Sequence, residues 1–192
     1  MTSTQSNTGS RPIHWLFLIG IVALVITVDQ ITKAYVVAHL DLHESWMPLD
    51  FVRPFFRFTH IRNTGAAFGI FPGSGAVFTV IALVVSVIVV YYYRQISGGM
   101  WLIRLALGLQ LGGALGNNVI DRPRLGYVVD FLHVEMWPVF NVADSCIVIG
   151  VVLLMLVVLR DEWRTARQSK AETQPADDEQ PCDSPEEPAL YQ

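Results

Sequence analysis

Two aspartates, Asp130 and Asp144, have a spacing that suits an acid–base pair. They lie fourteen residues apart, one leading out of a long apolar block and the other at the start of the next. Two carboxyls held close in a partly desolvated site cannot both ionise easily, so they share one proton. The ionised partner can then take a proton from water while the other donates to a carbonyl oxygen, which is the chemistry of an aspartic protease. Asn141 and Ser145 flank Asp144 and can hydrogen-bond the pair.

Four apolar blocks must position these residues, and the chain has the composition of a membrane protein. Of its 192 residues 16% are charged, and the mean hydropathy is +0.42. Blocks of about 18 apolar residues can cross a bilayer as helices. The four candidates begin at Ile13, Gly75, Trp101 and Val139, and their apolar runs end at Val28, Tyr93, Ile120 and Leu159. A secretory signal peptide is the alternative for the first block, but no cleavage site follows and the helical pattern continues to Lys33.

The charge distribution excludes nucleic-acid binding and marks off a tail. The formal charge is −4, but seven of the acids lie beyond Lys170, and residues 1–170 carry +3 without a basic stripe. Residues 171–192 are rich in Pro, Asp, Glu and Gln, which predicts disorder. We therefore expect a flexible N-terminus at 1–12, a membrane-embedded domain at 13–170 and an acidic tail at 171–192.

The acids of the apolar blocks gather at one membrane face. An even number of spans puts both termini on one side, and the basic cluster at 160–170 with the short loop near Arg94 favours the cytoplasm. Counted from the cytoplasmic ends at about 1.5 Å per residue, Asp29 lies roughly 24 Å and Asp144 roughly 22 Å up. Asp121 lies roughly 30 Å up, and Asp130 follows in the next connection. Charges at such depth are candidates for a functional site, although Asp29 could also form a simple ion pair with Lys33 one turn on.

The connection at 40–74 is the longest outer segment. It mixes aromatic and arginine side chains, which suits the headgroup level of a membrane. The stretch from Phe51 to Ile61 is β-rich and broken by Pro54, which predicts a short edge strand or hairpin. An interfacial loop without chemistry is the alternative.

Small residues follow at Gly65–Gly69 and again at Gly112–Gly116. Both stretches could admit a guest helix, or could simply pack helices closely. Arg122 ends the third block next to Pro123, and it could pair with Asp121 or Asp29 or hold a phosphate headgroup.

Five segments together resemble lipoprotein signal peptidase, the bacterial signal peptidase II family. The resemblance covers roughly residues 13–160, and the segments are Val28-Asp29-Gln30-Ile31-Thr32-Lys33, Asn63-Thr64-Gly65-Ala66-Ala67-Phe68, Gly113-Ala114-Leu115-Gly116-Asn117 through Asp121-Arg122, Val128-Val129-Asp130-Phe131 and Phe140-Asn141-Val142-Ala143-Asp144-Ser145.

The resemblance implies an all-α membrane protein, a four-helix bundle with both termini in the cytoplasm and a small β-like extracytoplasmic cradle between the first two spans. It implies an aspartic endopeptidase of the bacterial cytoplasmic membrane that cuts diacylglyceryl-modified prolipoproteins just before the lipidated cysteine, near the extracytoplasmic face. We expect a monomer with membrane lipid around it, and no cofactor or metal. Asp130 and Asp144 match the catalytic pair, and the supporting positions are Asp29, Asn63, Gly65, Asn118, Arg122 and Asn141.

One departure concerns the asparagine of the third segment. The family pattern has a single Gly-Asn before its Asp-Arg pair, whereas Gly116-Asn117-Asn118 adds a position. Counting back from Asp121 selects Asn118, and counting forward from Gly113 selects Asn117. We favour Asn118 because the distance to the catalytic residues matters more.

Other functions agree less well with the sequence. A metal enzyme could use the outer histidines, which are His39, His43, His60 and His133, but no H-E-x-x-H occurs. A nucleophile at Cys146 would lack a histidine at helical spacing. A carrier or proton path would need acids throughout the membrane depth, and a structural protein would not explain the aspartate segments.

Overall fold

The structure is a computed structural model, and it describes residues 12–65, 73–97 and 99–172. The chain divides into two units, residues 1–157 and 158–192. In the second unit the described residues are helical and expose their side chains as far as Gln168. The N-terminus at 1–12 and the tail at 171–192 lie almost wholly outside the described residues, as do Ala66–Gly69. All of the candidate site lies in the first unit.

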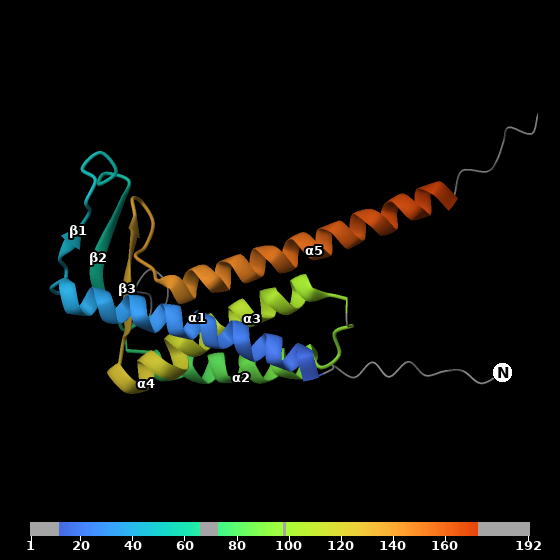
Figure 1. The fold of residues 1–192 in the computed structure, drawn as a ribbon, viewed down its shortest axis with the longest axis horizontal. Helices are drawn as coiled ribbons and strands as arrows, with labels where there is room; N and C mark the ends of the chain where they lie inside the picture. The colour runs from blue at the N-terminus through green and yellow to red at the C-terminus, as the bar shows by residue number, and fades with distance from the viewer. Residues whose placement is uncertain (1–11, 66–72, 98, 173–192) are drawn as a thin grey trace, which may run out of the picture. The chain divides into compact units, whose positions relative to one another are not determined.

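Three of the described helices are long and apolar enough to cross a membrane: α1 (Pro12–His39), α2 (Gly75–Tyr93) and the part of α5 (Val142–Glu172) that ends at Gln168. Most of their side chains are not buried by the rest of the protein, as expected for helices that face lipid. Figure 1 shows α1 and α2 running alongside α3 (Trp101–Leu115). The first, second and fourth apolar blocks therefore form the expected helices.

The third block, Trp101–Ile120, is helical but not one uniform α-helix. α3 passes directly into a π-helical turn, η2 (Gly116–Asp121), and then into the short α4 (Arg122–Leu125). A π-turn holds one more residue per turn than an α-helix, and such turns are frequent at functional sites. α3 by itself has 15 residues, and a membrane crossing by the whole succession stays a prediction.

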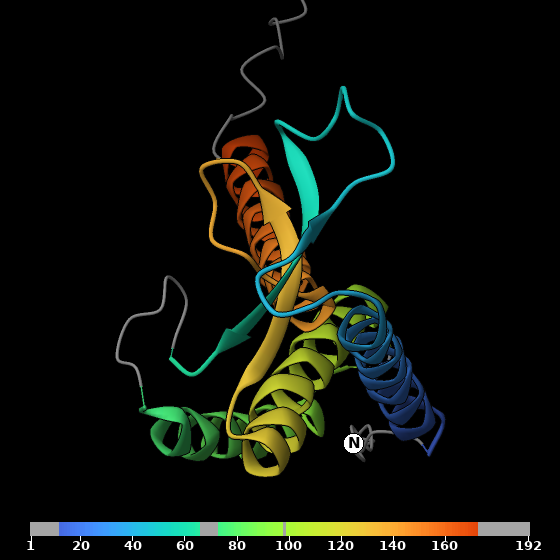
Figure 2. The same cartoon turned by 90° about the vertical axis from the view of Figure 1, so that its left-hand side faces the viewer.

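A three-stranded antiparallel sheet lies at one end of these helices (Figures 1 and 2). Its order is β1 (Ser45–Trp46), β2 (Phe56–Asn63) and β3 (Val128–Val134). The expectation of β structure between Phe51 and Ile61 is confirmed by β2, but the edge position is wrong, because β2 begins after Pro54 and pairs on both sides. The sheet is also not built between the first two spans alone, because β3 comes from the segment after α4.

β3 was not expected, since the sequence placed Asp130 in a connection. The chain turns from α4 into this strand at Gly126, whose φ of +80° lies in the left-handed region that favours glycine. Val128, Val129 and Phe131 are buried on the strand. Seven mostly apolar and β-branched residues between Gly126 and Pro138 were the signal that could have identified it.

Two adjacent glycines of α3 bring the helices close together. A Cβ on Gly112 would lie 2.8 Å from Cβ of Val25 in α1, and a Cβ on Gly113 would collide with the carbonyl oxygen of Ala143 in α5. Of the two alternatives for this stretch, these positions therefore serve helix packing. The close approach also fixes the start of α5 against α3, where the site is built.

The other end of the bundle is closed by Tyr93, which is fully buried and packs with Leu18 and Leu111. Its hydroxyl donates to the backbone oxygen of His14 at 2.6 Å. Arg104 lies over the tyrosine ring at 4.7 Å and donates to the backbone oxygen of Ile96 just beyond α2. A cation is favourable near the carbonyl end of a helix, so this arginine ties α3 to α2.

Candidate active site

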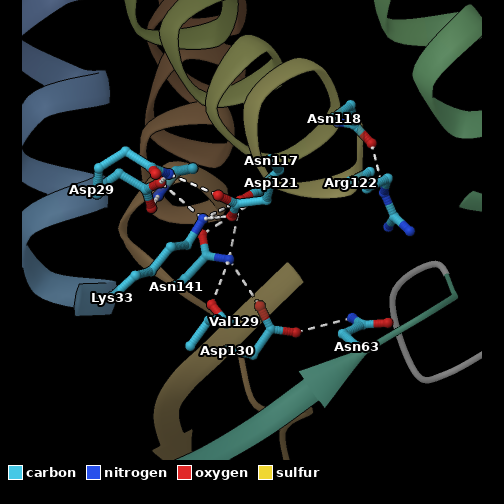
Figure 3. A network of polar contacts seen from close by, with 12 residues as sticks. Asp29, Lys33, Asn63, Asn117, Asn118, Asp121, Arg122, Val129, Asp130 and Asn141 are labelled. Atoms are coloured by element: carbon cyan, nitrogen blue, oxygen red, sulfur yellow. Dashed lines mark hydrogen bonds and ion pairs between the residues drawn. The ribbon is translucent and has the colours of Figure 1, made fainter. Parts of the chain in front are cut away.

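Asp130 lies on β3 and is buried (2% exposed). Its Oδ1 accepts a hydrogen bond from Asn141 Nδ2 at 2.7 Å, and its Oδ2 accepts one from Asn63 Nδ2 at 2.8 Å (Figure 3). Asn63 ends β2, and the antiparallel register places Ile61 of that strand opposite Asp130. The pairing of β2 with β3 therefore brings Asn63 to the aspartate.

Asp144 lies in the first turn of α5 and is half-buried. Its N–H donates to Asn141 Oδ1 at 3.0 Å, and the Asn141 N–H donates back to Asp144 Oδ2 at 3.1 Å. This reciprocal pair is a capping box with Asn and Asp in the two roles. Another N–H at the start of α5, that of Ala143, donates to Asp29 Oδ1 at 3.0 Å. The helix start, which leaves N–H groups unpaired, is thus bound by carboxylates from two elements.

The amides of Asn117 and Asn141 connect the two aspartates. Asn141 Nδ2 donates to Asn117 Oδ1 at 3.1 Å, and Asn117 Nδ2 lies 3.4 Å from Asn141 Oδ1. Asn141 also donates to Asp130, while Asn117 Nδ2 donates to Asp144 Oδ1 at 2.8 Å. Each aspartate therefore accepts a hydrogen bond from one member of the same amide pair.

Lys33 contacts this amide pair through the Asn117 oxygen and is buried (4% exposed). Its ammonium lies 2.7 Å from Asp29 Oδ2, 2.6 Å from Asp121 Oδ2 and 2.6 Å from Asn117 Oδ1 (Figure 3). The simple ion pair of Asp29 with Lys33 is present, but it is one part of a larger cluster. Gln30 extends it by donating to Asp121 Oδ1 at 2.8 Å.

The two neighbouring asparagines of η2 point to different groups. Asn117 contacts Lys33 and Asp144, whereas Asn118 Oδ1 accepts a hydrogen bond from Arg122 Nε at 3.0 Å. The added position of the sequence coincides with the π-turn, which takes up one extra residue. Asn117, rather than the favoured Asn118, therefore lies against the aspartates.

Arg122 does not pair with Asp121 or Asp29, because Lys33 holds both of those acids. Its Nη2 donates to the backbone oxygen of Gly65 at 2.6 Å, and its guanidinium lies 5.4 Å from the ring centre of Phe78. The Gly65 N–H in turn donates to Asn63 Oδ1 at 3.0 Å. Arg122 thus links η2 to the residue that contacts Asp130.

The surroundings of Asp130 favour its protonated form near neutral pH. Burial, followed by the charge of Asp144, raises the pKa of Asp130 from 3.8 to about 7. Hydrogen bonds from Asn63 and Asn141 and the charge of Lys33 act in the opposite direction. A carboxyl with such a pKa can hold or release a proton under physiological conditions.

A cavity of about 370 Å³ lies against both aspartates. It is lined by polar groups of η2 and by apolar residues of spanning helices, among them Phe78 of α2 and Ile147 of α5. A second groove of about 610 Å³ runs over the ends of β2 and β3 and is lined by Asn63 and Asp130 as well. Asp130 therefore lines both cavities, whereas Asp144 lines the cavity at the helices.

Two of the outer histidines contact backbone oxygens of α1 and of the residue that follows it. Nδ1 of His39 lies 2.8 Å from the carbonyl oxygen of Tyr35, and Nδ1 of His60 lies 2.9 Å from that of Leu40. In the part of the chain that the structure describes, no three His, Cys, Asp or Glu residues are grouped as metal ligands would be. Cys146 is a free, half-buried thiol on α5.

The comparison with known families identifies the family of the chain. The pattern of Signal peptidase (SPase) II matches residues 21–160. The chain belongs to the signal peptidase II family. It is therefore a protease of lipoprotein processing and a membrane protein, and the carrier and structural interpretations are set aside.

Similar proteins include the lipoprotein signal peptidases of Halothermothrix orenii and Bacillus subtilis. The first is 46% identical over 143 residues, which are 74% of this chain and 94% of that protein. The second is 41% identical over 152 residues, with 77% and 96% covered. A solved bacterial membrane enzyme is 32% identical with a TM-score of 0.69, over 76% of this chain and 89% of that one.

From the sequence, Lys33 was expected only as a simple ion-pair partner of Asp29, Gln30 was given no role, and Asn118 was favoured over Asn117. The signals were present: Gln30 and Lys33 lie one residue and one helical turn after Asp29. A lysine beside an acid at membrane depth is expected to neutralise that acid. The residue spacing does not show that Lys33 also contacts Asp121 and the amide of Asn117.

Proposed function

We propose that this signal peptidase is a membrane aspartic endopeptidase that acts on prolipoproteins carrying diacylglycerol on a cysteine. It cuts the signal peptide just before that cysteine. The observation that carries the proposal is the convergence of Asp130 and Asp144, from a strand and a helix start, on one amide pair beside a cavity lined by spanning helices. A lipidated substrate with an apolar helix can approach from the bilayer to such a cavity.

In the proposed reaction the two aspartates hold one proton between them. The ionised carboxylate takes a proton from water, the hydroxyl adds to the peptide carbonyl carbon, and the protonated carboxyl donates to the carbonyl oxygen. The resulting gem-diol then collapses: the C–N bond breaks, the leaving nitrogen takes up the proton that came from water, and a diol hydroxyl returns its proton to the pair. The raised pKa of Asp130 supports a shared proton near pH 7.

The other residues support this chemistry either by contacting the substrate or by holding other parts of the site in place. Asn63 and Arg122 line the cavities at Asp130, and we propose that they contact the substrate backbone or its lipid. Asp29 and Asn141 hold the start of α5. Gly65 and Asn118 hold Arg122.

The proposed membrane arrangement has four spans, with α3, η2 and α4 together forming the third. Both termini lie in the cytoplasm, the aspartates lie near the extracytoplasmic face of the bacterial cytoplasmic membrane, and the sheet covers them from outside. The working unit is a monomer without cofactor or metal, made of a flexible segment at 1–12, the catalytic domain at 13–170 and a disordered tail at 171–192.

The test is cleavage of a diacylglyceryl-modified prolipoprotein by the purified protein in detergent. Asp130→Asn and Asp144→Asn should each lower kcat by about a thousandfold or more while the protein stays folded, because neither amide can complete the proton transfers. Thermal unfolding of each variant is the control. Folded variants that keep their activity would exclude the aspartate mechanism, and an inert wild type would exclude the substrate.

A further inference from the structure

The three contacts of Lys33 use all of its hydrogen-bonding capacity. An ammonium group has three N–H donors and no acceptor, and Lys33 has three oxygen partners at 2.6 to 2.7 Å. Two of these are carboxylates, Asp29 and Asp121, so the charge is already paired. The third, Asn117 Oδ1, is not needed to neutralise the lysine, and it is the contact that leads toward the aspartate pair.

The contact with Lys33 determines which way the Asn117 amide points. Since the ammonium can only donate, it binds the amide oxygen, and the amide NH2 must face the other way. On that side Asn117 Nδ2 donates to Asp144 Oδ1 at 2.8 Å. Asn141 donates to the same Asn117 oxygen and also to Asp130 Oδ1, so the orientation of one amide constrains the other. Figure 3 shows Lys33, Asn117 and Asn141 in succession beside Asp130.

We propose that Lys33 is a positioning residue for the aspartate pair, and that it acts by locking the amides of Asn117 and Asn141 with their N–H groups toward Asp144 and Asp130. This inference rests on the proposed function of the pair. Lys33 itself does not touch the substrate. Its role is to keep both carboxyls supplied with donors throughout the proton transfers.

The charged groups around this amide pair make the effect measurable. Asp29 and Asp121 flank Lys33, Asp130 and Asp144 lie beyond the amides, and Gln30 faces Asp121. Arg122 is another cation whose charge acts on the two aspartates. The charge of Lys33 lowers the pKa of Asp130, so its loss should move the titration of Asp130 to higher pH.

The experiment uses a charge-balanced variant of the full-length protein. Lys33→Met by itself would leave two buried carboxylates without a cation, which is strongly destabilising. The double variant Lys33→Met with Asp121→Asn removes one charge of each sign. Its control is Arg104→Met, which removes another buried cation that donates only to a backbone carbonyl among the described contacts.

For the double variant we expect kcat on lipidated prolipoprotein to fall at least tenfold with little change in KM. The alkaline limb of its pH profile should move to higher pH, because the charge of Lys33 lowers the pKa of Asp130. Arg104→Met should leave the pH profile in place even where its Tm is lower. A folded double variant with wild-type kcat and pH profile would overturn the positioning role.

If the double variant does not fold, Lys33→Arg keeps the charge but replaces the compact ammonium by a planar fork. It should lower kcat at unchanged KM, and an unchanged kcat would overturn the inference. Failure of the proposed function is distinguishable, because it would appear as an inert wild type or as active Asp130→Asn and Asp144→Asn variants.

Discussion

The two sides of the aspartate pair are built differently. On the ion-paired side, formed by Asp29, Lys33 and Asp121, every residue is at most 4% exposed and every lysine donor has a partner. On the open side, formed by Asn63, Asn118 and Arg122, the groups line cavities. Nη1 of Arg122 is buried and has no hydrogen-bond partner among the described residues.

This difference separates the residues that hold the pair from those that can meet a substrate. A fully satisfied, buried polar cluster is rigid and leaves no donor for a ligand. A guanidinium with a free N–H at a cavity can still donate a hydrogen bond to an oxygen of a ligand. Changes on the ion-paired side should therefore act on kcat, and changes on the open side should act mainly on KM.

Among the residues around the aspartate pair, the largest effect is expected from Asn117→Ala, which removes the link between the ion-paired side and Asp144. Hydrogen bonds to charged groups contribute about 1.5–3 kcal/mol, so we expect kcat to fall by about a hundredfold. Steady-state kinetics on lipidated prolipoprotein would measure it, with Tm as the control for folding. A rise in KM at constant kcat would contradict the division of the site into two sides.

A smaller effect on kcat/KM is expected from raising the pH, which tests whether Asp130 carries the shared proton. Because the pKa of Asp130 is about 7, the pair loses its shared proton above that pH, and kcat/KM should fall about tenfold per pH unit. The folded-state pKa also lies above the ordinary 3.8, so the stability contributed by this group is fully present below about pH 4 and is lost as pH rises through about 7. A pH profile that is flat between 6 and 9 would contradict the shared proton.

The smallest effect is expected from Asn118→Ala, on the open side. It removes one hydrogen bond from Arg122, which keeps its bond to the Gly65 oxygen. We expect KM to rise about fivefold with kcat nearly unchanged, in line with about 1 kcal/mol for one hydrogen bond. The matched comparison is Asn117→Ala one position earlier. Equal loss of kcat in both variants would mean that the π-turn does not divide the two asparagines between the two sides.

Much of this arrangement could be predicted from the sequence. The apolar blocks predicted α1, α2 and α5, and the depth arithmetic placed Asp29 and Asp144 at similar heights, which agrees with the Ala143 N–H contact of Asp29 beside Asp144. Asn63 was also singled out, and it contacts Asp130. Apolar length and charge depth are local properties, so the sequence alone carries them.

The rest depended on contacts between distant segments. β3 pairs with β2, which lies far away in the sequence. That pairing was not recognised from the sequence, so Asp130 was expected in a connection. The partner of Asp121 is Lys33, 88 positions away, and no spacing rule connects the two. The choice between Asn117 and Asn118 turned on a π-turn, and a count of residues along an assumed α-helix cannot detect one.

The start of α5, with its capping box at Asn141 and Asp144, supplies the site with backbone N–H donors. Any helix that starts inside a protein must find acceptors for its first N–H groups, and here those acceptors are Asp29, Asn141 and Asp144 themselves. The backbone of α5 thereby takes over the solvating role that bulk water has for carboxylates at a surface. Asp29 and Asp144 therefore keep backbone hydrogen-bond donors even when a lipid-bearing substrate covers the site and excludes bulk water.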